Sequence, residues 1–445
     1  MMRAMYSGVS GLKVHQTRMD VIGNNIANVN TVGYKAQRVS FSDLFYQTSQ
    51  IATGPSETGL TGGSNAMQVG LGAGVAQITT NITERGGAQS TGNALDVMIN
   101  GDSFFIVQGD DGSEYFTKAG NFTTDGNGNL VTGSGNYVMG YTAAMNPDTG
   151  DMELQRDQLR PISLYGQQYM TTAPAQTTQA ILSGNINPQD EAYSTSGSGV
   201  INTKLYVYDS LGNQYGIQMD VRKVSDTEFT LTPSTVFNGT NPEEGLSAVF
   251  SGDGVNPDGS ITLTFDPTNG TITNDPANFT LNMTDGANNL PAFAEDITVD
   301  FSSLTNYGSD TDFDANAGID GVGAGKAVGK MSSIGISSDG SIVSSYTNGD
   351  VLVIGQLATA HFSNPAGLEK IGDNLFGQTL NSGNITYQTI DAAGESMTGG
   401  AVEMSNVDLA SEFTDMIVTQ RGFQANSRVI TTSDTMIEEL LSLKR

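Results

Sequence analysis

The 445-residue sequence lacks cysteine, has few basic residues and contains no long apolar run. Without cysteine, the chain cannot form disulfides, Cys-ligated metal sites or a thiol nucleophile. It has 19 Lys and Arg against 47 Asp and Glu, and this net charge of −28 repels nucleic-acid phosphates and anionic membranes. No apolar run reaches the roughly 18 residues of a membrane span, and the N-terminus lacks the apolar core of a signal peptide. We therefore expect no nucleic-acid binding and no membrane insertion.

Glycine is abundant, at 55 residues, and the middle of the chain alternates short apolar segments with turn pairs. Residues 95–99 and 104–107 have strand patterns, and residues 206–208 and 261–265 belong to a second β region. Asp-Gly and Asn-Gly pairs predict type I′ hairpin turns, because both central positions of that turn need positive φ. The pairs are Asp111-Gly112, Asp125-Gly126, Asp339-Gly340 and Asn348-Gly349.

Only the two ends of the chain have the apolar periodicity of long helices. Alternating spacings of three and four residues are typical of the seam of a coiled coil or helix bundle, whereas a single helix of this kind would be an ordinary core helix. The predicted seam residues are Met5, Val9, Leu12, Met19 and Ile26 near the N-terminus, and Leu409, Phe413, Met416, Phe423, Ile430, Ile437 and Leu441 near the C-terminus.

Neither helix can bury its apolar face alone, and short isolated helices are marginal in water. We therefore expect both ends to be disordered in the monomer and to become ordered when copies assemble. Further apolar residues are expected to face neighbouring copies. These are Val14, Val21, Ile22, Val402, Val418 and Val429.

These patterns predict a mainly β chain with long terminal α-helices and a nested, discontinuous topology. Residues 1–35 and 401–445 form a coiled-coil-like helical domain, and residues 36–90 form an extended connector. Residues 91–166 and 327–400 form an inner β domain. An outer β domain, residues 167–326, is inserted within it, because the composition changes near its two ends.

Three motifs have the superficial form of ligand sites. Residues 69–74 are glycine-rich like a dinucleotide loop, but a β-branched segment follows them instead of a helix. Residues 321–327 resemble a phosphate-binding loop, but Ala327 occupies the Ser/Thr position. Asp125 and its neighbours have calcium-loop spacing, but Asn136 occupies the position of the final Glu.

The two histidines, His15 and His361, have no adjacent nucleophile and no metal-ligand spacing. We therefore expect no catalytic residue, no cofactor and no metal site, although sequence alone cannot pair the 47 carboxylates.

The two ends also carry specific motifs. Residues 7–12 and 24–35 read SGVSGL and NNIANVNTVGYK, and residues 405–409, 416–426 and 443–445 read SNVDL, MIVTQRGFQAN and LKR. They resemble the N- and C-terminal signatures of the bacterial flagellar axial proteins, which comprise rod, hook and hook-associated subunits. The signature residues are Asn24, Asn25, Asn28, Thr31, Gly33, Tyr34, Lys35, Asn406, Gln420, Arg421 and Gln424.

Within that family, the length of the chain and residues 181–187, 207–213 and 352–368 resemble the hook subunits. The resemblance implies a structural protein that is not an enzyme. It implies export through the flagellar type III pathway without a cleaved signal, and polymerisation outside the cell into a curved, flexible tube that transmits torque from rod to filament. The implied partners are other copies, rod and hook–filament junction proteins, a hook cap, and an export chaperone and apparatus.

Other readings remain open at this point. Another axial protein, such as a distal rod or hook-associated subunit, would carry the same terminal signatures. An acidic, calcium-dependent surface adhesin would explain the Asp and Gly turns, but not the matched helices. A glycan hydrolase would need a cleft with a paired carboxylate. For the Asn cluster at residues 24–30, stopping the helix is favoured over direct contact between subunits.

Overall fold

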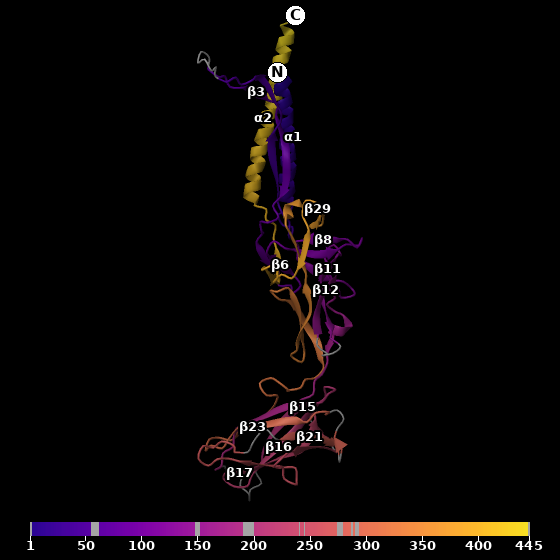
Figure 1. The fold of residues 1–445 in the computed structure, drawn as a ribbon, viewed down its shortest axis with the longest axis vertical. Helices are drawn as coiled ribbons and strands as arrows, with labels where there is room; N and C mark the ends of the chain where they lie inside the picture. The colour runs from indigo at the N-terminus through magenta and orange to yellow at the C-terminus, as the bar shows by residue number, and fades with distance from the viewer. Residues whose placement is uncertain are drawn as a thin grey trace. The chain divides into compact units, whose positions relative to one another are not determined.

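The computed structural model describes residues 2–54, 62–146, 152–189, 200–239, 241–243, 245–273, 279–285, 288–289 and 293–443. The structure is 47% strand, and the two α-helices within these residues are α1 (Met2–Ala27) and α2 (Leu409–Ser442) at the two ends (Figure 1). A mainly β chain with terminal helices is thus confirmed. The chain divides into two compact units, one of residues 1–166, 334–344 and 352–445, and the other of residues 167–333 and 345–351.

The two helices begin and end where local chemistry dictates. Asp408 caps α2, because its side chain accepts a hydrogen bond from the Ala410 N–H and a carboxylate also suits the positive end of the helix dipole. At the same end of the helix pair, α1 stops within the Asn cluster, where the Asn28 side chain donates to Asn24 Oδ1 at 2.6 Å. Among the described residues, neither helix is both long and apolar enough to cross a bilayer.

The segment predicted as an extended connector, residues 36–90, forms paired strands over much of its length. β1 (Gln37–Asp43) pairs antiparallel with β4 (Ala73–Thr80), and β2 (Tyr46–Gln50) pairs antiparallel with β3 (Met67–Gly70). Residues 55–61 lie outside the described residues. The β1–β4 pair packs along α1, so this segment covers one side of the N-terminal helix.

The rest of the first unit is antiparallel. Its largest sheet has the order β27-β11-β7-β8-β30-β29, and β5–β33 and β6–β32 are separate pairs that bring the start and the end of the β region together. Phe104, Phe116 and Phe362 form edge-to-face contacts in its core. The remaining strands of this unit are β5 (Ala88–Ser90), β6 (Val97–Asn100), β7 (Phe104–Gln108), β8 (Glu114–Thr117), β9 (Phe122–Thr124), β10 (Leu130–Thr132), β11 (Tyr137–Met145), β12 (Met152–Pro161), β27 (Val351–Leu357), β28 (Thr359–Phe362), β29 (Glu369–Gly372), β30 (Leu375–Gly377), β31 (Ile385–Gln388), β32 (Ser396–Gly399) and β33 (Ala401–Glu403).

The second unit contains two sheets that share one core. The sheets have the orders β19-β21-β23-β14-β24 and β15-β16-β17-β18, and Leu182, Leu231 and Phe301 are among the buried side chains between them. Its strands are β13 (Thr171–Thr172), β14 (Gln179–Asn185), β15 (Ile201–Tyr208), β16 (Gln214–Lys223), β17 (Glu228–Asn238), β18 (Asn241–Pro242), β19 (Leu246–Ser251), β20 (Ile261–Thr264), β21 (Thr280–Asp285), β22 (Asn288–Asn289), β23 (Ile297–Thr305) and β24 (Asp312–Ala317). The unit boundary passes through β25 (Gly329–Ile336) and β26 (Ser341–Tyr346).

The type I′ prediction for the Asp-Gly and Asn-Gly pairs is wrong. Among the described non-glycine residues, only Asp320, Asp373 and Asn374 have positive φ, so no Asp or Asn of those pairs does. The acidic or amide side chain instead accepts the N–H two residues on, as Asp339 does from Ser341 at 3.0 Å. This Asx-turn holds the first residue outside the left-handed region. Two consecutive left-handed residues occur at Asp373-Asn374, between β29 and β30.

Candidate functional site

The candidate site is the antiparallel pair of α1 and α2 together with the polar junction at its base. Small residues let the two helices approach closely. A Cβ atom at Gly11 would lie 2.6 Å from the Asn426 side-chain nitrogen, and one at Gly422 would lie 2.6 Å from His15 Cε1. Near the base of the pair, Arg18 and Asp415 form an ion pair at 2.9 Å.

Because the helices approach closely at small residues, the face of α2 that lies against α1 differs from the predicted seam. Residues of the predicted seam divide into a half-buried set and an exposed set. The half-buried residues are Met5, Leu12, Met19, Ile26, Met416, Ile430 and Ile437, and the exposed ones are Val9, Leu409, Phe413, Phe423 and Leu441. The buried residues of α2 are instead Thr419 and Ser433, which are small and polar. The inner face of α2 is therefore lined by small residues, and several large apolar ones point away from α1.

A second difference concerns residues expected to face neighbouring copies. Val14 and Ile22 are buried within the chain at 5% and 3% exposure, and Val402 is buried in β33. The β1–β4 pair, which packs along α1, was not foreseen from the sequence. Phe41 of β1 contacts the His15 ring edge-to-face at 6.0 Å. Val418 and Val429 are exposed at 55% and 43%, and Val21 is half-buried.

Asn25 is the hydrogen-bonding centre where α1 meets the start of α2. Its side-chain nitrogen donates to the Gln37 carbonyl at 2.8 Å and to Glu412 Oε1 at 2.9 Å. Its oxygen accepts from the Gln37 N–H at 3.0 Å and the Tyr34 hydroxyl at 3.2 Å. All four hydrogen-bonding positions of the amide are therefore used. Burial raises the pKa of the Glu412 carboxyl, and its hydrogen bond from Asn25 opposes that shift.

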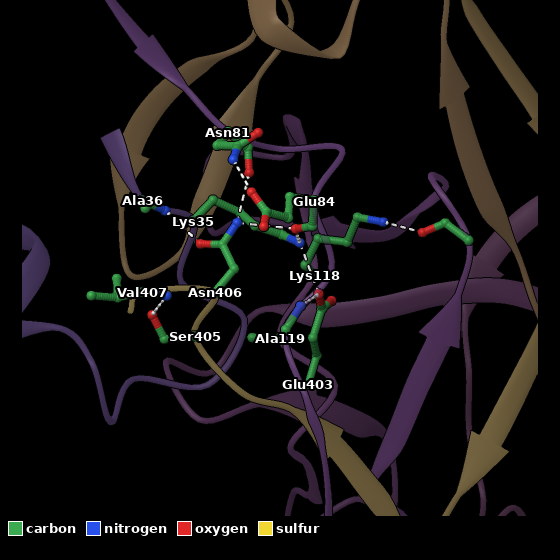
Figure 2. Close-up of polar contacts among 12 residues, drawn as sticks. Lys35, Ala36, Asn81, Glu84, Lys118, Ala119, Glu403, Ser405, Asn406 and Val407 are labelled. Atoms are coloured by element: carbon green, nitrogen blue, oxygen red, sulfur yellow. Dashed lines mark hydrogen bonds and ion pairs between the residues drawn. The ribbon is translucent and has the colours of Figure 1, made fainter. Parts of the chain in front are cut away.

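Lys35 and Glu403 form a buried ion pair across 368 residues of sequence (Figure 2). The Lys35 Nζ lies 2.8 Å from Glu403 Oε1, and the two side chains are 0% and 1% exposed. Lys35 also donates to the Glu84 carbonyl at 2.8 Å, and the Gly86 N–H donates to Glu403 Oε1 at 2.9 Å. Such a pair contributes little net stability by itself, but removing one partner leaves a buried charge.

Asn406, which lies just before α2, forms hydrogen bonds with the segment that follows α1. Its side-chain oxygen accepts the Ala36 N–H at 2.8 Å, and its nitrogen donates to the carbonyls of Asn81 and Glu84 at 2.9 and 3.0 Å (Figure 2). The Gly33 N–H donates to the Glu403 carbonyl at 2.8 Å. Residues 33–36 are thereby bound to residues 403–406, so the two chain ends meet at one place.

Further contacts fasten the same segment to the β region. Lys370 donates to the Lys35 carbonyl at 2.8 Å and lies 4.5 Å from the centre of the Tyr34 ring. Thr31 donates to Asn28 Oδ1 at 3.1 Å, and Asn374 donates to the Val32 carbonyl at 2.9 Å. The structure thus unites the N-terminal signature residues and Asn406. Gln420, Arg421 and Gln424 instead lie exposed on α2, apart from the junction.

Sequence reasoning missed Glu403, Glu84, Lys370 and Lys118. Lys118 is 2% exposed, donates to the Gly101 carbonyl at 2.8 Å and lies 4.8 Å from the centre of the Phe104 ring (Figure 2). Its pKa is lowered to about 8, and burial is the largest cause of this shift. No sequence signal marks these residues, because single charged residues beside apolar strands are usually solvated.

The buried Lys118 predicts a rise in stability at alkaline pH. Its pKa is about 8 when folded and 10.5 in the unfolded reference, so the unfolded chain binds more protons between these values. The free energy of unfolding should therefore rise with pH across that window, on the order of 3 kcal/mol from this group. Lys118→Met should reduce this rise in urea titrations at pH 7.5–10, leaving the contribution of Lys370, whose pKa is also about 8. An equal slope in Lys118→Met and in a control at exposed Lys330, Lys330→Met, would contradict this.

The motifs that superficially resembled ligand sites are explained by backbone contacts. Asp125 Oδ1 accepts the N–H groups of Asn127 and Asn129 at 2.9 and 2.7 Å, which closes a turn. In the glycine-rich loop 321–327, the Gly323 carbonyl accepts the Thr178 N–H at 2.9 Å. Residues 69–74 run from β3 into β4. Within the described part of the chain, no cluster of three or more His, Asp or Glu has the arrangement of a metal site.

Comparison with known families gives four matches that together cover most of the chain. Residues 5–35 match the flagella basal body rod protein family, and residues 98–179 match the flagellar hook protein FlgE/F/G D1 domain. Residues 172–321 match the flagellar basal body protein FlaE D2 domain, and residues 398–443 match the flagellar basal body rod FlgEFG protein C-terminal family.

Similar proteins extend over the full length. The flagellar hook protein FlgE of Borreliella burgdorferi is 37% identical over 460 residues, and that of Treponema pallidum is 35% identical over 493 residues, with 100% of each chain covered in both cases. The flagellar basal-body rod protein FlgG of Bacillus subtilis is 30% identical over 452 residues, again with 100% of each chain covered.

Proposed function

Since this chain belongs to the flagellar hook protein family, we propose that it is a structural subunit of the bacterial flagellar hook. Copies of it polymerise into a curved, flexible tube that transmits torque from rod to filament. The helix pair forms the coiled-coil-like inner part of that tube. Residues 91–166 with 327–400 form an inner β domain, and residues 167–326 form an outer one inserted within it.

The observation that carries the assembly role is the apolar surface of α2. Large side chains are exposed along almost its whole length, and such a surface marks a contact with another protein. Phe413 is 51% exposed and Ile417 is 59% exposed. The other exposed apolar residues of this helix are Leu409, Val418, Phe423, Val429, Met436, Leu440 and Leu441.

We extend the proposal to the partners and the location of the subunit. The subunit binds other copies first, and the rod, the hook–filament junction, the hook cap and the export apparatus through its ends. It is exported without a cleaved signal and works in the flagellum outside the cell. A distal rod subunit is less well supported, because the hook relatives are more similar to the chain than the rod relative is. A calcium-dependent adhesin has no support at Asp125, whose carboxylate closes a turn.

Polymerisation of the purified full-length chain tests the proposal. As concentration and salt are raised, electron microscopy should show tubes, and amide exchange of residues 2–27 and 409–442 should be fast in the monomer and slow in the tube. The double variant Phe413→Ser/Ile417→Ser should form no tubes, because it removes apolar contacts between copies. Leu211→Ser, which changes a residue 68% exposed in the other unit, is the matched control. A wild-type chain that never forms tubes, with both helices already protected in the monomer, would refute the role.

A further inference from the structure

The last turns of α2 extend beyond the end of α1. Ala4 and Ser433 line the same groove, so the antiparallel helix α1 ends near residue 437 of α2. Every residue from 438 to 443 is exposed, including Leu440 at 52% and Leu443 at 81%. The chain itself therefore leaves this segment, called here the α2 overhang (residues 438–443), without a covering surface among the described residues.

A groove of about 590 Å³ lies beside the start of α1, on α2. Ala4, Ala425 and Val429 contribute small or apolar surface to it, whereas Arg421 and Arg428 contribute two guanidinium groups. Neither arginine forms an ion pair with another residue in the described ranges. The groove is thus lined by both apolar and basic residues and is open to solvent.

Helix geometry places one acid of the overhang on the same side of α2 as these arginines. At about 100° per residue, the 18 residues from Arg421 to Glu439 complete five turns, and the 11 residues from Arg428 to Glu439 leave an offset of only about 20°. Met436 and Leu443 lie within about 60° of this side. Glu438, by contrast, is rotated about 100° away from Glu439.

We propose that the α2 overhang of one copy docks in this groove of a second copy, with Glu439 facing Arg421 and Arg428. Leu443 then covers the apolar part of the groove. Each copy offers one overhang and one groove, so the contact is head-to-tail, the type of contact from which a helical tube is built when the rotation between copies does not close a ring. The opposite charges set the register of the two helices. This inference rests on the proposed function, since it identifies one contact by which the copies assemble.

Charge reversal in the full-length chain tests the pairing, with polymer sedimentation as the measurement. Glu439→Arg and Arg428→Glu should each raise the critical concentration for polymerisation about tenfold. Glu438→Arg makes the same change of charge on the neighbouring residue and should leave it within about threefold. Either Glu439→Arg/Arg428→Glu or Glu439→Arg/Arg421→Glu should restore polymerisation. Circular dichroism of each monomer checks that the fold is retained.

The outcomes separate this pairing from the hook role itself. Tubes formed equally well by Glu439→Arg and by the wild type would overturn the pairing and leave the hook role intact. So would equal effects of Glu438→Arg and Glu439→Arg, or failure of both double variants to recover. A wild-type chain that does not polymerise counts instead against the proposed function.

Discussion

Lys35→Met is expected to lower the free energy of unfolding of the first unit by about 3–5 kcal/mol. The substitution leaves the Glu403 carboxylate buried without its cation, since its side chain is only 1% exposed. It also leaves the Glu84 carbonyl without the donor that lies at 2.8 Å. Native-state hydrogen exchange of β6 and β7, which lie in the same unit, measures the loss against the wild type.

Two variants make this expectation specific to the buried pair. Lys13→Met removes an exposed lysine from α1 and should change stability by less than about 0.5 kcal/mol. Lys35→Met/Glu403→Gln removes both charges while Gln still accepts the Gly86 N–H, so it should recover part of the loss. A single variant that unfolds as late as the wild type, or a double variant less stable than the single one, would contradict the pairing.

Gly33→Ala is expected to destabilise the first unit by about 2–4 kcal/mol, from left-handed backbone strain together with overpacking. Gly33 has φ +69°, and an added Cβ would lie 2.7 Å from the Ala119 backbone nitrogen and 2.9 Å from its Cα. Both contacts are with backbone, which cannot rotate away. The substitution therefore moves the segment that carries Tyr34 and Lys35 away from its partners.

Gly23→Ala is the matched control for this prediction. It makes the same change in α1, but an added Cβ there has no neighbour within 4 Å. Because alanine favours the helix over glycine by up to about 1 kcal/mol, this variant should be as stable as the wild type or more stable. Urea unfolding of Gly33→Ala and Gly23→Ala measures the difference in their free energies of unfolding. Equal values would show that the turn at Gly33 tolerates a side chain.

The sequence motifs include several residues of the junction, but they do not show which residues these contact. Asn25, Tyr34, Lys35 and Asn406 were singled out as signature residues, and the structure brings them to one place. Their partners were not predictable, because Glu403 and Lys370 belong to parts of the chain whose approach depends on the whole topology. Of the seam residues predicted on α2, Met416, Ile430 and Ile437 are half-buried and the others are exposed, for a related reason. Periodicity identifies apolar positions, but small residues such as Gly422 decide which face meets α1.

By itself, the sequence determined the features that depend on neighbouring residues. Apolar spacing near three and a half identified the two terminal helices, and short apolar runs identified strands such as β6 and β7. The matched terminal motifs identified the family. These features are local, so few residues suffice to encode each of them.

Tertiary structure alone decided which side chains lost contact with water. It buried Lys118 beside Phe104, joined Lys35 to Glu403, and packed the β1–β4 pair along α1. The Lys35–Glu403 contact joins segments 368 residues apart in the sequence. Solvation, and with it the energy of a charge or an apolar group, is therefore set by the path of the whole chain.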